Sequence, residues 1–261
     1  MLQGCDVSSY QDDDRTLPQI DFVKMKNAGA KFVYIRASQS LWKDPDFDYN
    51  WSEAKKAGLA RGAYCFFSYW ENRNSRGPKQ QAKFFADLLQ ADPGELPPMM
   101  DYEQPNATFP PLPAQAVRWQ DIQSFGDVVD QATGRTCGLY CNGSFLKVLQ
   151  PFPAWLTKKP LWIAAWPLVP AGKTAEEVIA AGWKPATAGW DWTIWQYSSN
   201  GSGPKYGVES LSVDMDYFNG DEPELAALIG AEHPAEPVHP LTLEERIAKL
   251  EAEARTRGWP V

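Results

Sequence analysis

Apolar segments rich in β-branched and aromatic residues recur along this chain, and loops rich in glycine, proline and polar residues bound them. Short segments of this composition are typical of β-strands. The pattern predicts eight strands, at residues 2–7, 31–37, 61–69, 96–105, 136–141, 161–166, 193–198 and 213–218.

Segments with helical spacing of apolar residues lie between the early strands. The spacing predicts helices over residues 21–28, 47–57, 78–88 and 113–133, a weak helix over 174–181, and a closing helix over 221–229. Strands that alternate with helices indicate right-handed crossovers and a parallel sheet. Eight such strands can close into an α/β barrel whose active site lies at the carboxyl ends of the strands.

The pattern divides the chain into three parts. Residues 1–230 form the expected barrel, and residues 231–240 form a proline-rich linker that favours extended structure. Residues 241–261 are expected to form a short charged helix, with a narrow apolar stripe of about two heptads. That helix is a candidate for docking on the barrel, for self-association or a virion contact through residues 241–257, or for the stub of a fused module.

Charge and hydropathy exclude several classes of function. The net charge of −8 argues against non-specific binding to nucleic acid and against attraction to anionic membranes. No apolar run approaches the ~20 residues that span a bilayer. The first residues lack a basic region followed by an apolar core, so we expect synthesis in the cytoplasm without a signal peptide.

The cysteine and tryptophan residues do not indicate a specific functional site. Cys5, Cys65, Cys137 and Cys141 have neither disulfide-framework nor zinc-type spacing, so we expect four buried thiols in a reducing compartment. Aromatic rings can stack on sugars, but they also fill cores, and core packing is the expectation for most of the 12 tryptophans.

The candidate chemistry lies at the end of the fourth strand, where Asp101 and Glu103 follow an apolar run. Residues two apart on a strand share a face, about 6.5–7 Å apart. Two close carboxyls push their pKa values apart, which suits acid-assisted cleavage of an acetal. An isolated pair of this kind is common, but Asp6 and Asp214 belong to the first and eighth strands, which are neighbours in a closed barrel. Four acids are therefore expected at one mouth.

Eight short motifs, in order over residues 3 to about 220, make the chain resemble a known family. The chain is similar to the glycoside hydrolase family 25 lysozymes, the Chalaropsis-type N-acetylmuramidases of bacteria, fungi and phages. The motifs are Gly-Cys-Asp-Val-Ser-Ser-Tyr-Gln from residue 4, Phe-Val-Tyr-Ile-Arg-Ala from 32, Asn-Trp at 50 with Ala-Lys-Lys-Ala-Gly-Leu from 54, Arg-Gly-Ala-Tyr from 61, Met-Asp-Tyr-Glu from 100, Leu-Trp-Ile-Ala from 161, Trp-Gln-Tyr-Ser-Ser from 195 and Val-Asp-Met-Asp-Tyr-Phe from 213.

The resemblance implies a modified TIM-like barrel, (β/α)5(β)3, with helices mainly in its first five units. It implies an enzyme that hydrolyses the β-1,4 bond between N-acetylmuramic acid and N-acetylglucosamine of bacterial peptidoglycan, without a metal or other cofactor. Glu103 matches the general acid and Asp101 the second essential carboxylate, and Asp6 and Asp214 match flanking acids. Action on the cell wall is expected after release, as an endolysin of phage or prophage origin, or within a phage particle.

Candidate substrate contacts come from the ends of other strands. They are Tyr64, Phe66, Tyr140, Trp166, Gln196 and Asp216. The chain departs from the family at two positions, because Cys65 stands where the family often has histidine and Asp216 where it often has asparagine. These departures affect local substrate contacts rather than the acid pair.

Several alternatives stay open from the sequence. The second carboxylate could act as nucleophile, as base for water, or by orienting the N-acetyl group of the substrate, with retention through N-acetyl participation favoured. Competing functions are a non-catalytic barrel that binds wall glycan, a structural lysin of a virion, and a chitinase-type hydrolase. Met99 stands where the acidic run of the chitinase motif requires aspartate.

Overall fold

The computed structural model describes residues 1–12, 19–104 and 108–230. The expected linker and charged helix of residues 231–261 lie outside the described residues. The sheet of the fold contains the strands β1 (Leu2–Val7), β2 (Phe32–Gln39), β3 (Trp42–Lys43), β4 (Ala60–Phe66), β5 (Met99–Asp101), β6 (Gly138–Asn142), β7 (Leu161–Ala164), β8 (Ile194–Ser202) and β9 (Ser212–Phe218).

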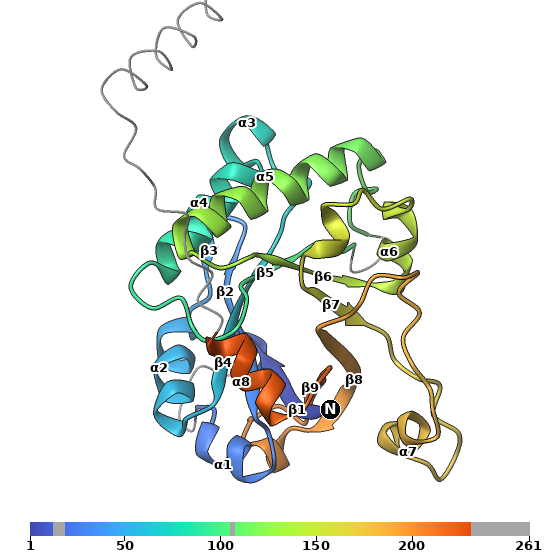
Figure 1. The fold of residues 1–261 in the computed structure, drawn as a ribbon. Helices are drawn as coiled ribbons and strands as arrows, with labels where there is room; N and C mark the ends of the chain where they lie inside the picture. The colour runs from blue at the N-terminus through green and yellow to red at the C-terminus, as the bar shows by residue number, and fades with distance from the viewer. Residues whose placement is uncertain (13–18, 105–107, 231–261) are drawn as a thin grey trace, which may run out of the picture.

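Eight of these strands close into a barrel (Figure 1). The order is β1-β9-β8-β7-β6-β5-β4-β2, and pairing of β1 with β2 completes the ring, while β3 lies outside it. The eight-stranded barrel expected from the sequence is therefore confirmed. Each predicted strand corresponds to one barrel strand, although several are shorter than the apolar runs that predicted them.

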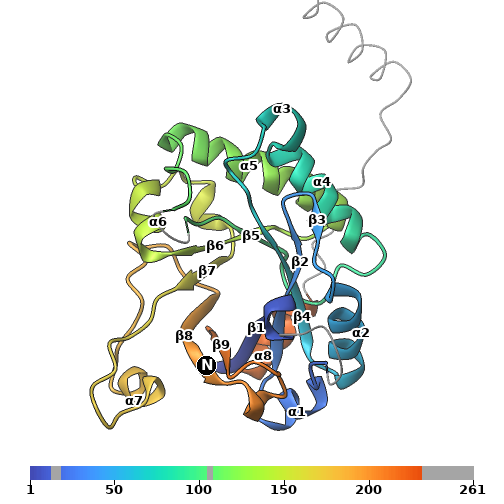
Figure 2. The same ribbon diagram turned by 180° about the vertical axis from the view of Figure 1, so that it is seen from behind.

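Helices connect most of the strands, and several of them lie against the outside of the ring of strands (Figures 1 and 2). Pro78 opens α4 at a position where its missing N–H costs nothing, and Gly58 and Gly134 end α2 and α5 in left-handed conformation. The helices are α1 (Phe22–Asn27), α2 (Phe47–Ala57), α3 (Arg73–Arg76), α4 (Pro78–Leu89), α5 (Gln115–Thr133), α6 (Gly143–Leu149), α7 (Ala175–Ala180) and α8 (Glu222–Gly230), with 3-10 turns η1 (Ser9–Gln11), η2 (Leu156–Lys158) and η3 (Pro204–Tyr206).

One strand of the closed barrel runs against the other seven. β1, β2 and β4 to β8 pair in parallel wherever they neighbour one another, but β9 is antiparallel to both β8 and β1. The nine-residue connection from Gly203 to Leu211 holds only the turn η3, too little for a crossover, so β9 must return beside β8. Its amino-terminal half consequently reaches the rim where the parallel strands have their carboxyl ends. Asp214 therefore pairs in register with Asp6.

The inward-facing side chains fill the lower barrel with aromatic rings. Tyr34 stacks on Trp162 with ring centroids 4.6 Å apart, and Tyr64 and Tyr140 pack edge-on against the same indole. Gly62 makes room for this cluster, since a Cβ there would lie 2.1 Å from the Tyr34 ring. The barrel is thus closed below and open only at the rim.

The outer layer of the core lies between the strands and the helices. Outward-facing residues such as Val33, Ile35 and Ile163 pack there against apolar faces of the helices. All four cysteines are buried free thiols, as expected. Within the described part of the chain, no helix combines the length and apolar character needed to span a bilayer.

Candidate active site

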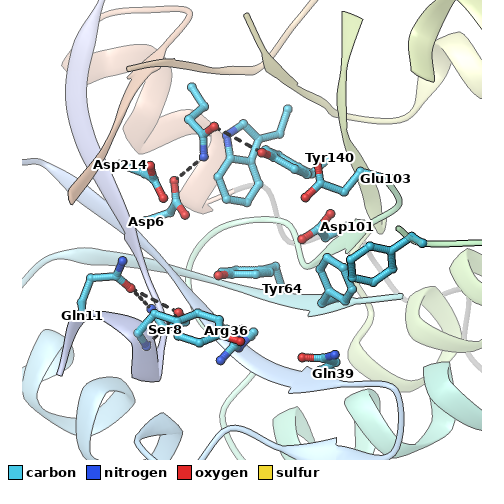
Figure 3. A pocket seen from close by; sticks show the side chains of 15 residues that line it. Asp6, Ser8, Gln11, Arg36, Gln39, Tyr64, Asp101, Glu103, Tyr140 and Asp214 are labelled. Atoms are coloured by element: carbon cyan, nitrogen blue, oxygen red, sulfur yellow. Dashed lines mark hydrogen bonds between the residues drawn. The ribbon is translucent and has the colours of Figure 1, made fainter. Parts of the chain in front are cut away.

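A cavity of about 340 Å³ opens at the rim of the barrel (Figure 3). Its floor is the aromatic cluster described above, and its walls come from nearly every barrel strand. The lining residues are Asp6, Ser8, Tyr10, Gln11, Arg36, Gln39, Tyr64, Phe66, Asp101, Glu103, Phe109, Tyr140, Trp162, Gln196 and Asp214.

Two pairs of carboxyl groups face each other across this cavity. Asp101 and Glu103 lie on one side, and Asp6 and Asp214 lie on the other (Figure 3). The arrangement brings together the four acids that the sequence placed at one mouth. It also gives the cavity a concentration of negative charge that only Arg36 opposes among its described lining residues.

The Asp101–Glu103 pair depends on an interruption of β5. The strand ends at Asp101, earlier than the sequence predicted. Tyr102 points outward, where its ring packs against Phe67 and its hydroxyl donates to Asp121 Oδ2 at 2.8 Å. This anchor turns Glu103 back into the cavity although it is no longer in the sheet.

A hydrogen-bonded chain fixes the opposite wall. The Tyr140 hydroxyl donates to Gln196 Oε1 at 3.2 Å, and Gln196 Nε2 donates to Asp6 Oδ2 at 2.9 Å (Figure 3). The chain sets the orientation of the Gln196 amide and directs its N–H group at Asp6. A buried carboxyl with one fixed donor is held in place but still carries much of its desolvation cost.

Burial raises the pKa of every acid in this group. It raises the pKa of Glu103 to about 7, where the charge of Asp214 adds to the effect and a hydrogen bond from Asn142 opposes it. Burial and then the charge of Glu103 hold the pKa of Asp101 well above its ordinary range, while Arg36 acts against them. Burial raises the pKa of Asp214 to about 6. A protonated carboxyl is therefore available near neutral pH.

The predicted substrate contacts divide into two groups. Tyr64, Phe66, Tyr140 and Gln196 line the cavity. Trp166 does not; it is 56% exposed and lines a separate hollow beyond Asn142, together with Trp183. The strand that was expected to carry Trp166 inward ends at Ala164, so the alternation no longer aims its side chain at the mouth.

Asp216 is the other predicted contact that does not line the cavity. It is fully buried below the floor, where its Oδ1 accepts a hydrogen bond from Trp162 Nε1 at 2.8 Å. Its carboxyl also faces that of Asp6, and the two form a hydrogen bond when one of them holds a proton. Burial raises the pKa of Asp216 to about 8, so it holds a proton at neutral pH.

Sequence reasoning missed some of the lining residues. The inward position of Arg36 could have been predicted, because Arg36 follows Tyr34 by two residues on the same strand and so shares its inward face. Tyr10 lies in the 3-10 turn η1, Gln39 ends β2 and Phe109 lies in a loop, so strand or helix periodicity does not place them. Their positions follow only from tertiary packing.

A closed α/β barrel with facing carboxyl pairs at its rim is an arrangement typical of barrel glycosidases. Within that class, residues 5–206 match the glycosyl hydrolases family 25, and the chain belongs to this family. It is therefore a glycoside hydrolase.

Individual relatives agree with this assignment. The chain is 30% identical over 239 residues to lysozyme M1 of Streptomyces globisporus, covering 87% of this chain and 71% of the relative. It is 31% identical over 211 residues to the N,O-diacetylmuramidase of Chalaropsis sp., covering 76% of this chain and 88% of the relative. The crystal structure of a Streptomyces coelicolor lysozyme superposes with a TM-score of 0.65 at 28% identity, covering 87% of this chain and 96% of that one.

The buried acid below the floor gives a prediction about stability. The folded protein holds a proton on Asp216 up to about pH 8, whereas the unfolded chain loses it near pH 4. The folded state thus binds more protons in this interval, so the free energy of unfolding falls as pH rises from about 4 to about 8. Asp216→Asn, which keeps the shape without the titration, should reduce that fall in urea unfolding at pH 5 and pH 8. An unchanged pH dependence would contradict a protonated Asp216.

Proposed function

We infer that this glycoside hydrolase is a peptidoglycan muramidase that cleaves the β-1,4 bond between N-acetylmuramic acid and N-acetylglucosamine. The observation that carries the inference is the Asp101–Glu103 pair facing Asp6 and Asp214 in one cavity of a family 25 barrel. A barrel that only bound wall glycan would have no need to bury four carboxyls at its mouth, at a substantial cost in desolvation.

Glu103 is the general acid in this proposal. A pKa raised to about 7 means that a large share of Glu103 is protonated at neutral pH, and its carboxyl lines the cavity. As the glycosidic bond breaks, Glu103 gives its proton to the departing oxygen, which leaves as a neutral hydroxyl. The resulting carboxylate then takes a proton from the incoming water.

Asp101 is the group that orients the substrate. Its side chain is only 5% exposed, and its Oδ1 has no hydrogen-bond donor among the described residues. An N–H group of the substrate's acetamido arm supplies such a donor, and the acetamido oxygen is then directed at the anomeric carbon. Protonation of Glu103 removes the charge that most opposes ionisation of Asp101, and Arg36 favours the Asp101 anion.

In this route the acetamido group of the substrate is the nucleophile of the first step. The acetamido oxygen forms a bond to the anomeric carbon as the glycosidic oxygen leaves with the proton of Glu103, and Asp101 stabilises the positive charge on the acetamido nitrogen. Water then attacks the same carbon and releases the acetamido oxygen, so two inversions give net retention. Asp6 and Asp214 shape the field around Glu103.

The bacterial cell wall is the site of action of such an enzyme. We propose delivery to the wall either by release from a host cell, as with an endolysin, or within a phage particle. Self-association or a virion contact through residues 241–257 is a further proposal that rests on the sequence pattern alone.

Replacement of the proposed acid tests the assignment of Glu103. Glu103→Gln keeps the shape but cannot donate the proton, so kcat on purified peptidoglycan should fall by about 10²–10⁴-fold. The readout is turbidity clearing together with identification of the new reducing ends. Glu222→Gln, at an exposed site on α8, is the matched control and should clear like wild type. Wild-type clearing by Glu103→Gln would refute the role, and new N-acetylglucosamine reducing ends would refute the muramidase assignment.

The role of Asp101 predicts the stereochemistry of the product. Proton NMR of the first reducing ends should show the β-anomer, because two inversions restore the starting configuration. Glycan from which the N-acetyl groups have been removed should be cleaved far more slowly than acetylated glycan. An initial α-anomer would show direct attack of water and would exclude N-acetyl participation.

A further inference from the structure

A second hollow, of about 590 Å³, lies on the rim beside the catalytic cavity. The two share Tyr10 and Gln39 as lining residues, so one continues into the other. We call it the rim hollow; it is lined by Tyr10, Gln39, Ser40, Leu41, Trp42, Ser68, Trp70, Glu71 and Arg76. The end of β2, the turn after it and the short strand β3, which lies outside the closed barrel, contribute Gln39, Ser40, Leu41 and Trp42 to its wall.

Exposed aromatic rings line this hollow. The side chain of Tyr10 is 71% exposed and that of Trp42 is 47% exposed, which is unusual for rings of this size. Both rings pack on the guanidinium of Arg36, whose central carbon lies 4.8 Å from the Tyr10 centroid and 5.9 Å from that of Trp42. Arg36 therefore covers part of each ring, and much of the surface of both rings stays open to solvent.

A buried ion pair holds Arg36 in position. Its Nε lies 2.7 Å from Asp44 Oδ2, and its terminal nitrogen donates to Ser9 Oγ at 3.0 Å. Asp44 also accepts from the backbone N–H groups of Ser9 at 3.1 Å and of Asp46 at 3.0 Å. The network ties η1, β2 and the start of α2 together, so the aromatic rings rest on a rigid base rather than on a loose loop.

The hairpin turn supplies a second, independent observation. Ser40 has a φ of 51°, a strained value for a residue with a side chain, and its N–H donates to Phe66 O at 3.1 Å. The Ser40 side chain is 95% buried, and its hydroxyl has no hydrogen-bond partner among the described residues. A strained turn thus holds an unpartnered polar group in the lining of the hollow.

We propose that the rim hollow is a distal subsite for an amino-sugar unit of the same glycan strand that is cut at the mouth. The open faces of Trp42 and Tyr10 stack on the apolar face of the pyranose ring, and the hydroxyl of Ser40 bonds a sugar hydroxyl or acetamido group. The proposal rests on the proposed function, because the hollow is continuous with the catalytic cavity.

The charges of the hollow favour a sugar over the peptide stems of the wall. Among the described residues, Glu71 and Arg76 are the only charged side chains that line it, and they lie 3.6 Å apart as an ion pair. They leave no net charge for recognition of an ionic peptide. Flat aromatic surface combined with neutral hydrogen-bonding groups suits a neutral pyranose instead.

Trp42→Ala tests the subsite. On long glycan strands freed of peptides, we expect KM to rise about five- to tenfold with kcat unchanged, because a distal contact binds ground state and transition state alike. On a peptide-free tetrasaccharide, too short to fill both the mouth and the rim hollow, the change should be less than twofold. Trp42→Phe should restore most of the affinity, and Leu211→Ala, at an 88% exposed site that lines neither the catalytic cavity nor the rim hollow, is the control.

A binding measurement separates this proposal from the proposed function. In the Glu103→Gln background, titration with the same long strands is followed by tryptophan fluorescence, with and without Trp42→Ala and with Ser40→Ala as a second, smaller change. Both substitutions should weaken binding even if the mechanism assigned to Glu103 proves wrong. Equal affinity for long strands in all variants would overturn the subsite. A loss seen only on peptide-bearing strands would assign the hollow to the stem peptide and would also overturn it.

Discussion

The site depends on one constraint, which is that side chains alternate between the inside and outside of a closed barrel. In β2 and β5 the inward positions are apolar at the bottom and charged at the rim, with Tyr34 below Arg36 and Met99 below Asp101. The rings below exclude water from beneath the acids, and the rim positions place the acids in a shared space. Burial and mutual repulsion then follow together, and both raise the pKa values of the carboxyls.

The antiparallel direction of β9 completes this arrangement. If β9 ran parallel to its neighbours, Asp214 would lie toward the base of the barrel, because this residue is near the start of the strand. Running in the opposite direction, the same residue meets Asp6 at the rim. The acid group is consequently built from both strand directions, and Glu103 experiences the charge of Asp214 across the cavity.

Much of the fold and of the acid group could be predicted from the sequence, because strand periodicity and strand order are encoded in short segments. The barrel, the early helices and the gathering of Asp6, Asp101, Glu103 and Asp214 follow from those patterns. The hairpin strand Trp42–Lys43 was missed because two residues show no alternation. Asp216 and Trp166 were expected at the mouth, but the depth of a residue in a barrel depends on where its strand begins and ends, and strand ends are set by tertiary contacts.

The proposed chemistry depends on burial in this group of acids, which keeps much of Glu103 protonated near neutral pH. Carbon-13 NMR of the Glu103 carboxyl, assigned by comparison with Glu103→Gln, measures this directly. Glu103 should show a main titration near pH 7 that moves to lower pH in Asp214→Asn, because the neighbouring negative charge is gone. A Glu103 that titrates near pH 4, the ordinary value of an exposed glutamate, would contradict the account.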